Sequence, residues 1–257
     1  MLQKIRNIVR AHGVSGLAQR SIAFAYRRGV RRCIPFGQPI YYAGIPICHD
    51  RKWGDRIVPT SWIPSEAIAD QPGYEAALLA GLGQTVRSGD SVVIVGAGLG
   101  VTAVVAALRT GPSGTVQCFE GSKRHVRLVQ RTAARNGVTN IVVHHAVVAK
   151  AIDVYGSGGD VGIVVPSSQL PPCNVLELDC EGAEVEILRE LTIQPRIILV
   201  ETHGVYGAPT NLVAWLLERR GYIVSDLGVA ANKDHCTKHD IRVLLGSNNR
   251  QVYFDTA

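Results

Sequence analysis

The feature that most constrains the fold is a turn of three glycines between an apolar run and a helix-like run, in the stretch VVIVGAGLGVTAVVAALRTG. Glycine adopts positive φ readily and lets another group approach the backbone closely, so Gly96, Gly98 and Gly100 predict a tight turn from strand to helix. The backbone N–H groups and helix N-terminus at such a turn favour an anionic or carboxylate group. We therefore expect Gly96, Ala97, Gly98 and Gly100 to bind a nucleotide-like cofactor.

Strand and helix patterns alternate over the rest of the chain, with short loops between them. Predicted strands cover 91–95, 115–119, 141–144, 175–178, 196–201, 222–226 and 241–245, and predicted helices cover 74–86, 101–108, 122–136, 183–191 and 211–220. Several of these strands are apolar on both faces, which is typical of a parallel sheet covered by helices. The pattern predicts a doubly wound α/β domain over residues 73–257, preceded by an extension over residues 1–72 that is helical at first and then irregular, with a short strand near residues 40–47.

Positive charge is concentrated at the N-terminus. The chain has a net charge of +6, and since residues 1–49 carry +8, residues 50–257 carry −2. One interpretation of residues 1–32 is a helix with a solvated basic face; the other is docking on an anionic membrane surface or a lipid-linked substrate. No apolar run is long enough to span a membrane, and six cysteines without a Cys-x-x-Cys pair favour a reduced environment. We expect a cytoplasmic protein, with peripheral membrane association as the alternative.

A carboxylate follows the glycine turn at the spacing expected for ribose recognition. Glu120 ends the next predicted strand, 24 residues after Gly96, where a carboxylate can accept hydrogen bonds from both ribose hydroxyls. Dinucleotide sites need a third small residue in Gly-x-Gly-x-x-Gly/Ala, and here that place holds the branched Val101. The glycines instead form Gly-x-Gly-x-Gly, which suits S-adenosylmethionine. A nicotinamide-dependent oxidoreductase is the alternative enzyme class.

Four blocks of sequence resemble the FkbM family of class I S-adenosylmethionine-dependent methyltransferases. The blocks are VGAGLG, VQCFEGS followed by RNGVTNIVVHHAVV, LELDCEGAEVEILREL, and VETHG. The resemblance covers residues 73–246 and implies a Rossmann-like, seven-stranded sheet whose last strand is antiparallel. It also implies O-methylation of hydroxyls, often on sugars or natural products, and places Ala146 among the cofactor contacts.

One position departs from this resemblance. Such enzymes usually carry Asp or Glu two residues before the first glycine, where it helps to hold the methionine amino group, whereas this chain has Ile94. We hypothesise that Glu75, in the preceding segment PGYE, supplies the missing carboxylate. A degenerate methyltransferase fold that only binds partners is the non-enzymatic alternative.

Candidate catalytic residues follow the fourth and fifth predicted strands of the domain, at the sheet edge where ligands bind. Asp179, Glu181 and Glu184 follow one strand, and Glu201 and His203 follow the other. His203 is the candidate base for removing a hydroxyl proton, Asp179 would orient it or hold substrate hydroxyls, and Glu181 is the third candidate. The alternatives are helix N-terminal stabilisation by Glu181 and Glu184 and a loop histidine at 203. We expect no metal, with a divalent cation held by Asp179 and either Glu201 or Glu181 as the minority alternative.

Two further motifs lie outside this edge. The segment Pro171–Asn174 resembles the Asn-Pro-Pro-aromatic motif of amino-group methyltransferases but precedes its strand, so a nucleic-acid substrate is disfavoured. His235, Cys236 and His239 have metal-like spacing in a predicted loop near the substrate entrance, without the four ligands of structural zinc. The sequence therefore predicts an S-adenosylmethionine-dependent O-methyltransferase whose partner is a small-molecule or glycan hydroxyl acceptor, such as a sugar or glycolipid.

Overall fold

The computed structural model describes residues 40–47, 71–150, 162–230 and 233–248, together with positions 14 and 21. Apart from positions 14 and 21, these residues all belong to one compact unit, which spans residues 39–49 and 68–257. The basic helical extension predicted over residues 1–32 lies outside the described residues, apart from Val14 and Ser21, which are both helical. No helix among the described residues is long and apolar enough to cross a membrane.

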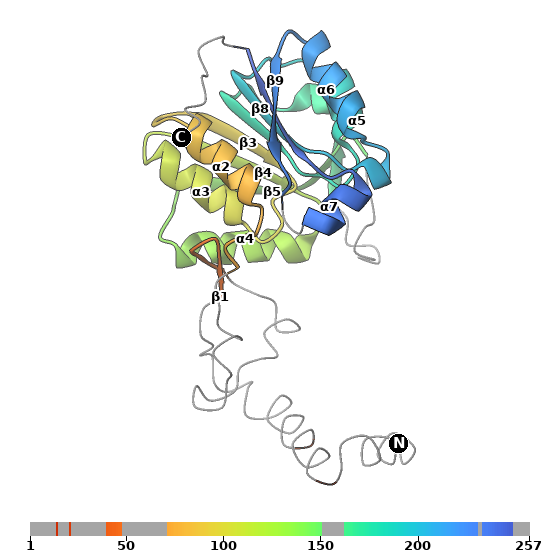
Figure 1. Cartoon of the computed structure of the whole chain (residues 1–257). Helices are drawn as coiled ribbons and strands as arrows, with labels where there is room; N and C mark the ends of the chain where they lie inside the picture. The colour runs from red at the N-terminus through yellow and green to blue at the C-terminus, as the bar shows by residue number, and fades with distance from the viewer. Residues whose placement is uncertain are drawn as a thin grey trace. The chain divides into compact units, whose positions relative to one another are not determined.

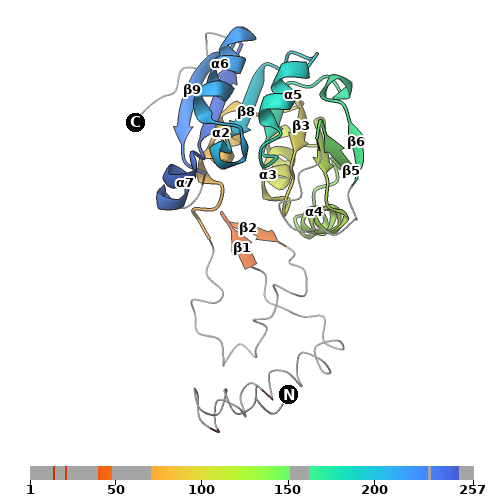
Figure 2. The same ribbon diagram turned by 90° about the vertical axis from the view of Figure 1, so that its right-hand side faces the viewer.

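The described part of this unit contains a central sheet of eight strands. In chain order they are β3 (Ser91–Val95), β4 (Thr115–Glu120), β5 (Ile141–Val148), β6 (Ile163–Val165), β7 (Val175–Leu178), β8 (Ile197–Glu201), β9 (Ile223–Gly228) and β10 (Val243–Ser247). Their spatial order is β6-β5-β4-β3-β7-β8-β10-β9, and Figure 2 shows β6 and β9 at opposite edges. Strand β10 is antiparallel to β8 and β9, and the other pairs are parallel. The predicted doubly wound, mostly parallel sheet, with its last strand antiparallel, is confirmed.

Helices cover both faces of the sheet. They are α2 (Ala76–Thr85), α3 (Val101–Thr110), α4 (Lys123–Arg135), α5 (Glu184–Glu190) and α6 (Thr210–Arg219). Side chains of α2, α3 and α4 share one buried cluster with Val92 and Ile94 of β3, whereas α5 and α6 share the other with Val93 and Val95. Figure 1 shows α2 beside α3 and α5 beside α6. Alternating residues of one strand thus face two different apolar layers, as expected of a doubly wound sheet.

Three elements differ from the sequence-based expectation. Strand β6 adds an eighth strand to the predicted seven; three residues carry too little periodicity to be recognised. The segment predicted as a loop between the last two strands forms α7 (Lys233–His239). The single strand predicted near residues 40–47 is a hairpin of β1 (Ile40–Tyr42) and β2 (Ile45–Ile47). Its turn residues Ala43 and Gly44 both have positive φ, of 48° and 76°, as a tight hairpin turn requires.

The hairpin packs against the start of α3. Tyr42 and Ile47 form a small buried cluster with Val101, and the amide of Asn136 donates a hydrogen bond of 2.9 Å to the carbonyl of Pro46. Val101, the residue that breaks the dinucleotide pattern, is therefore a core residue held against the hairpin.

We expect the substitution Glu177→Leu to stabilise the protein. Glu177 is fully buried on β7 between Ile94 of β3 and Leu199 of β8, which are also fully buried. Burial, with the charge of Glu75 in addition, raises the pKa of Glu177 well above its usual range, whereas Thr102 lowers it. Removing a buried carboxyl from apolar surroundings should raise the free energy of unfolding by about 1–3 kcal/mol. Urea denaturation followed by circular dichroism measures this. Glu190→Leu, on the exposed surface of α5, is the control, and a clear loss of stability specific to Glu177→Leu would contradict the expectation.

Candidate active site

A cavity of about 350 Å³ lies at the carboxyl ends of the parallel strands. Residues predicted for cofactor binding that line it are Gly96, Gly98, Glu120, Glu75 and Ala146, and predicted acceptor-side residues that line it are Asp179, Glu181 and Glu201. Ala97, Gly100 and His203 are not among its lining residues; Ala97 and His203 are buried beside it. The structure therefore brings both predicted groups to one cavity.

The three glycines of the turn have different structural roles. A Cβ on Gly96 would lie 1.7 Å from the carbonyl oxygen of Asp179, and one on Gly100 would lie 3.0 Å from Cα of Val129. A Cβ on Gly98 would meet nothing within 4 Å. Gly96 and Gly100 thus allow segments of the protein to pack closely, whereas Gly98 leaves open space at the cavity.

Glu120 is held at the cavity by the backbone. Its Oε2 accepts a hydrogen bond of 3.1 Å from the N–H of Gly98, and its Oε1 accepts one of 2.8 Å from the N–H of Ser122. His125 Nδ1 lies 3.7 Å from the same Oε1. A carboxylate has about four lone-pair sites, so this fixed group can still accept hydrogen bonds from the hydroxyls of a ribose.

The cavity also contains residues that the sequence reasoning did not select. Tyr74 and Phe119 provide aromatic walls, and Ser122 and His125 lie beside Glu120. Ser122 caps α4, since its Oγ accepts a hydrogen bond of 3.4 Å from the N–H of His125. A serine followed by a helical pattern was the available signal for this position.

Glu75 lies near the strand ends in an unusual backbone conformation. It is half-buried and has φ 45° and ψ 34°, which is the left-handed region that few residues other than glycine adopt. Burial, together with the charge of Asp179, raises its pKa to about 8, and a hydrogen bond with Tyr74 acts in the opposite direction. Ile94 is fully buried and does not line the cavity, whereas Glu75 does.

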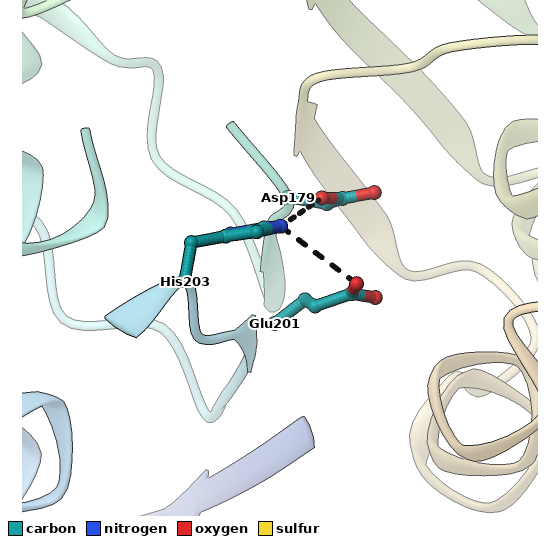
Figure 3. A group of neighbouring side chains, drawn as sticks. All are labelled: Asp179, Glu201 and His203. Atoms are coloured by element: carbon teal, nitrogen blue, oxygen red, sulfur yellow. Dashed lines mark ion pairs between the residues drawn. The ribbon is translucent and has the colours of Figure 1, made fainter. Parts of the chain in front are cut away.

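His203 is surrounded by four carboxyl groups. Its Nδ1 lies 2.8 Å from Oε1 of Glu184, which is fully buried at the start of α5. Its Nε2 lies 3.5 Å from Glu181 Oε2, 3.6 Å from Asp179 Oδ1 and 3.8 Å from Glu201 Oε1. Figure 3 shows Asp179 and Glu201 reaching toward this nitrogen from neighbouring strand ends. The predicted juxtaposition of these residues is present in the structure, and Glu184 is the one that bonds the ring directly.

The carboxyl groups shift the pKa of the ring and of one another. Burial lowers the pKa of His203. The hydrogen bond with Glu184 and the charges of Asp179, Glu184 and Glu181 raise it by more than burial lowers it, to about 9. Burial, with the charges of Glu181 and Glu184, raises the pKa of Asp179 to about 7 against the effect of His203. Burial and the charge of Asp179 raise the pKa of Glu201 to about 10. At neutral pH the ring of this cluster keeps its proton, so a base role for His203 requires that proton to leave first.

The two other motifs have structural roles. The side chain of Asn174 accepts a hydrogen bond of 2.8 Å from the N–H of Ser91, which ties the start of β7 to β3 at the edge opposite the cavity. On α7, the rings of His235 and His239 lie 4.5 Å apart, while Cys236 is buried. Asp240, next to them, accepts hydrogen bonds of 2.9 and 2.7 Å from the N–H and Oγ1 of Thr210 at the start of α6.

No family model and no curated protein sequence matches this chain. Among solved structures, the chain is similar to precorrin-6y C5,15-methyltransferase from Geobacter metallireducens, with a TM-score of 0.46, 14% identity, and 72% of this chain and 92% of that chain covered. A methyltransferase from Pyrococcus furiosus gives a TM-score of 0.47 and 13% identity over 90% of this chain and 99% of that one. Fibrillarin from Aeropyrum pernix, solved with natively bound S-adenosyl-L-methionine, gives 0.44 and 16% identity over 67% of this chain and 76% of that one.

We expect Gly96→Ala and Gly98→Ala to differ strongly in stability, although both glycines have positive φ, of 91° and 49°. Gly98→Ala adds left-handed strain alone and should cost about 1–2 kcal/mol. Gly96→Ala also drives a methyl group into a backbone carbonyl, and should cost about 3 kcal/mol or more. Urea unfolding of the two variants gives the comparison, and equal losses would show that the contact with Asp179 relaxes easily.

Proposed function

We propose that this chain is an S-adenosylmethionine-dependent methyltransferase of the FkbM family that methylates a hydroxyl group of a sugar, glycan or glycolipid. The observation that carries the proposal is the pairing of Glu120 with the open space at Gly98 on the rim of one cavity. The cavity volume of about 350 Å³ falls within the range of small-molecule sites, roughly 300–1,000 Å³.

The residues present fit such a cofactor at both of its ends. Glu120, with Gly98 and Ala146, would hold the adenosine, because the fixed carboxylate suits the ribose hydroxyls. Glu75, beside Gly96, would hold the amino group of the methionine portion in place of a carboxylate at Ile94. When bound, the cofactor supplies an electrophilic methyl group, and the protein mainly has to position the acceptor oxygen.

The acceptor side is built from carboxyl groups. Asp179, Glu181 and Glu201 line the cavity and accept hydrogen bonds from acceptor hydroxyls, which suits a molecule with several of them. As the new C–O bond forms and the methyl–sulfur bond breaks, the hydroxyl proton passes to this cluster. His203 lies behind the carboxyl groups, so it could take up this proton at Nε2 only after losing its own, and then through Asp179, Glu181 or Glu201. The basic residues 1–32 would bring the enzyme to an anionic surface or lipid-linked acceptor.

We expect S-adenosylhomocysteine, and not NADH, to raise the melting temperature of the full chain. A ligand at about 100 times its Kd stabilises the folded state by about 2.7 kcal/mol, because it binds that state alone. Glu120→Gln should remove most of this increase, whereas the exposed Glu190→Gln should retain it. An increase with NADH alone would support the oxidoreductase alternative, and no increase with either ligand would support the degenerate fold.

The role of Glu75 is tested with two ligands that share an adenosine. S-adenosylhomocysteine has the amino-acid portion, and 5′-methylthioadenosine lacks it. We expect Glu75→Gln to weaken binding of the first by about tenfold, the equivalent of roughly 1.4 kcal/mol, and to leave the second unchanged. Glu120→Gln should weaken both. Calorimetry measures these affinities, and equal losses for both ligands in Glu75→Gln would show that Glu75 only shapes the cavity.

A further inference from the structure

We propose that Asp179, Glu201 and His203 form a binding site for a divalent transition-metal ion on the acceptor side of the cavity. Asp179 follows β7, Glu201 ends β8, and His203 lies two residues beyond it. The three side chains converge from these adjacent strand ends, as Figure 3 shows. The sequence offered a divalent cation at Asp179 as an alternative to a metal-free site. The proposed site gives that cation one nitrogen donor and two oxygen donors.

The spacing of the donor atoms suits a single ion. One donor atom from each of the three residues lies within 4.8 Å of the others. Nε2 of His203 is 3.6 Å from Oδ1 of Asp179 and 3.8 Å from Oε1 of Glu201. Ligands about 2.1 Å from an ion are separated from each other by about 3.0–4.2 Å in octahedral or tetrahedral geometry. Side-chain movements of less than about 1 Å would complete the site.

The imidazole is already oriented for this role. Glu184, which is fully buried, bonds Nδ1 at 2.8 Å and also accepts a hydrogen bond of 3.2 Å from the N–H of Cys180. With Nδ1 engaged in this way, Nε2 is the nitrogen that faces Asp179 and Glu201. A histidine that binds a metal commonly donates its other ring N–H to a carboxylate, which fixes the ring and the tautomer.

A separate observation at the same place is a buried carboxylate oxygen that lacks a partner. Glu201 is nine-tenths buried and lines the cavity, and its buried Oε2 makes no hydrogen bond within the described part of the chain. Among the described residues, the ion pairs of Asp179 and Glu201 are those with His203 alone. Buried polar atoms normally have a partner, and a cation beside Glu201 would provide one.

The donor set indicates the class of ion and its use. Two carboxylates suit hard ions, and an imidazole favours first-row transition ions, so Mn²⁺ is a better match than Mg²⁺ or Ca²⁺. Asp179 and Glu201 border the cavity, so the open coordination positions would face the acceptor. If the proposed methyl transfer is correct, an ion there would bind the acceptor hydroxyl and lower its pKa, and the hydroxyl proton would pass to Glu181, a cavity residue that is not a ligand, rather than to His203.

The test is Mn²⁺ binding to the full chain, followed by electron paramagnetic resonance. We expect one Mn²⁺ per chain, with nitrogen coupling from a bound imidazole in pulsed spectra. Asp179→Asn, Glu201→Gln and His203→Gln should each weaken binding by at least about tenfold, and the coupling should disappear in His203→Gln. Glu184→Gln should weaken binding by about tenfold through the orientation of the ring, while Glu190→Gln should bind as the unmodified chain does.

Circular dichroism and S-adenosylhomocysteine binding control for the folding of each variant. Mn²⁺ affinity that survives Asp179→Asn and Glu201→Gln, or bound Mn²⁺ without nitrogen coupling, would overturn the metal site. A chain that binds S-adenosylhomocysteine but no Mn²⁺ would overturn the metal site and leave the proposed function intact. A chain that binds Mn²⁺ at these residues but no S-adenosylhomocysteine would overturn the proposed function and leave the metal site intact.

Discussion

The contact between Gly96 and the backbone of Asp179 is the constraint on which the site depends. The N–H of Asp179 donates to the carbonyl of Val95, and the N–H of Gly96 donates to the carbonyl of Phe119, so the ends of three adjacent strands are tied together. Any side chain at position 96 would occupy the space of the Asp179 carbonyl. This close passage brings the residue after β7 beside the glycine turn, so that the cofactor side and the acceptor side share one cavity.

The sequence predicted elements well where periodicity is long and both faces are apolar. The bounds of β3 and β7 agree with the prediction, and α4 begins one residue after the predicted start at Ser122. The misses are short or polar. Strand β6 has only three residues and pairs with the second half of β5, which no local pattern indicates. Helix α7 is rich in charged residues and histidine, a pattern that favours a loop. In the structure it is a helix whose residue Cys236 is buried.

The candidate site was predictable in its strand-end residues and less so in the residues that orient them. Glu120, Asp179 and Glu201 follow or end strands, and the fold alone brings such positions to the cavity. Glu184 was assigned to helix stabilisation as readily as to chemistry, because a sequence cannot show that its carboxyl group bonds the ring of His203. The environment of His203 was equally hidden, since the protonation of one imidazole depends on four carboxyl groups from three segments.

The charge of the cavity distinguishes the cofactor classes more sharply than the glycine pattern does. Among the described residues, five carboxyl groups line it, on Glu75, Glu120, Asp179, Glu181 and Glu201, against one lysine, Lys150, and the ring of His125. A dinucleotide would bring its anionic pyrophosphate beside these groups, and a further anion would raise the already elevated pKa values of Glu75, Asp179 and Glu201 still more. S-adenosylmethionine carries a cationic sulfonium and an ammonium group, and its single carboxylate can be met by the backbone N–H groups of the glycine turn. The same excess of carboxyl groups that disfavours a pyrophosphate favours a cationic cofactor and a divalent ion, because a cation lowers the pKa of each carboxyl group beside it.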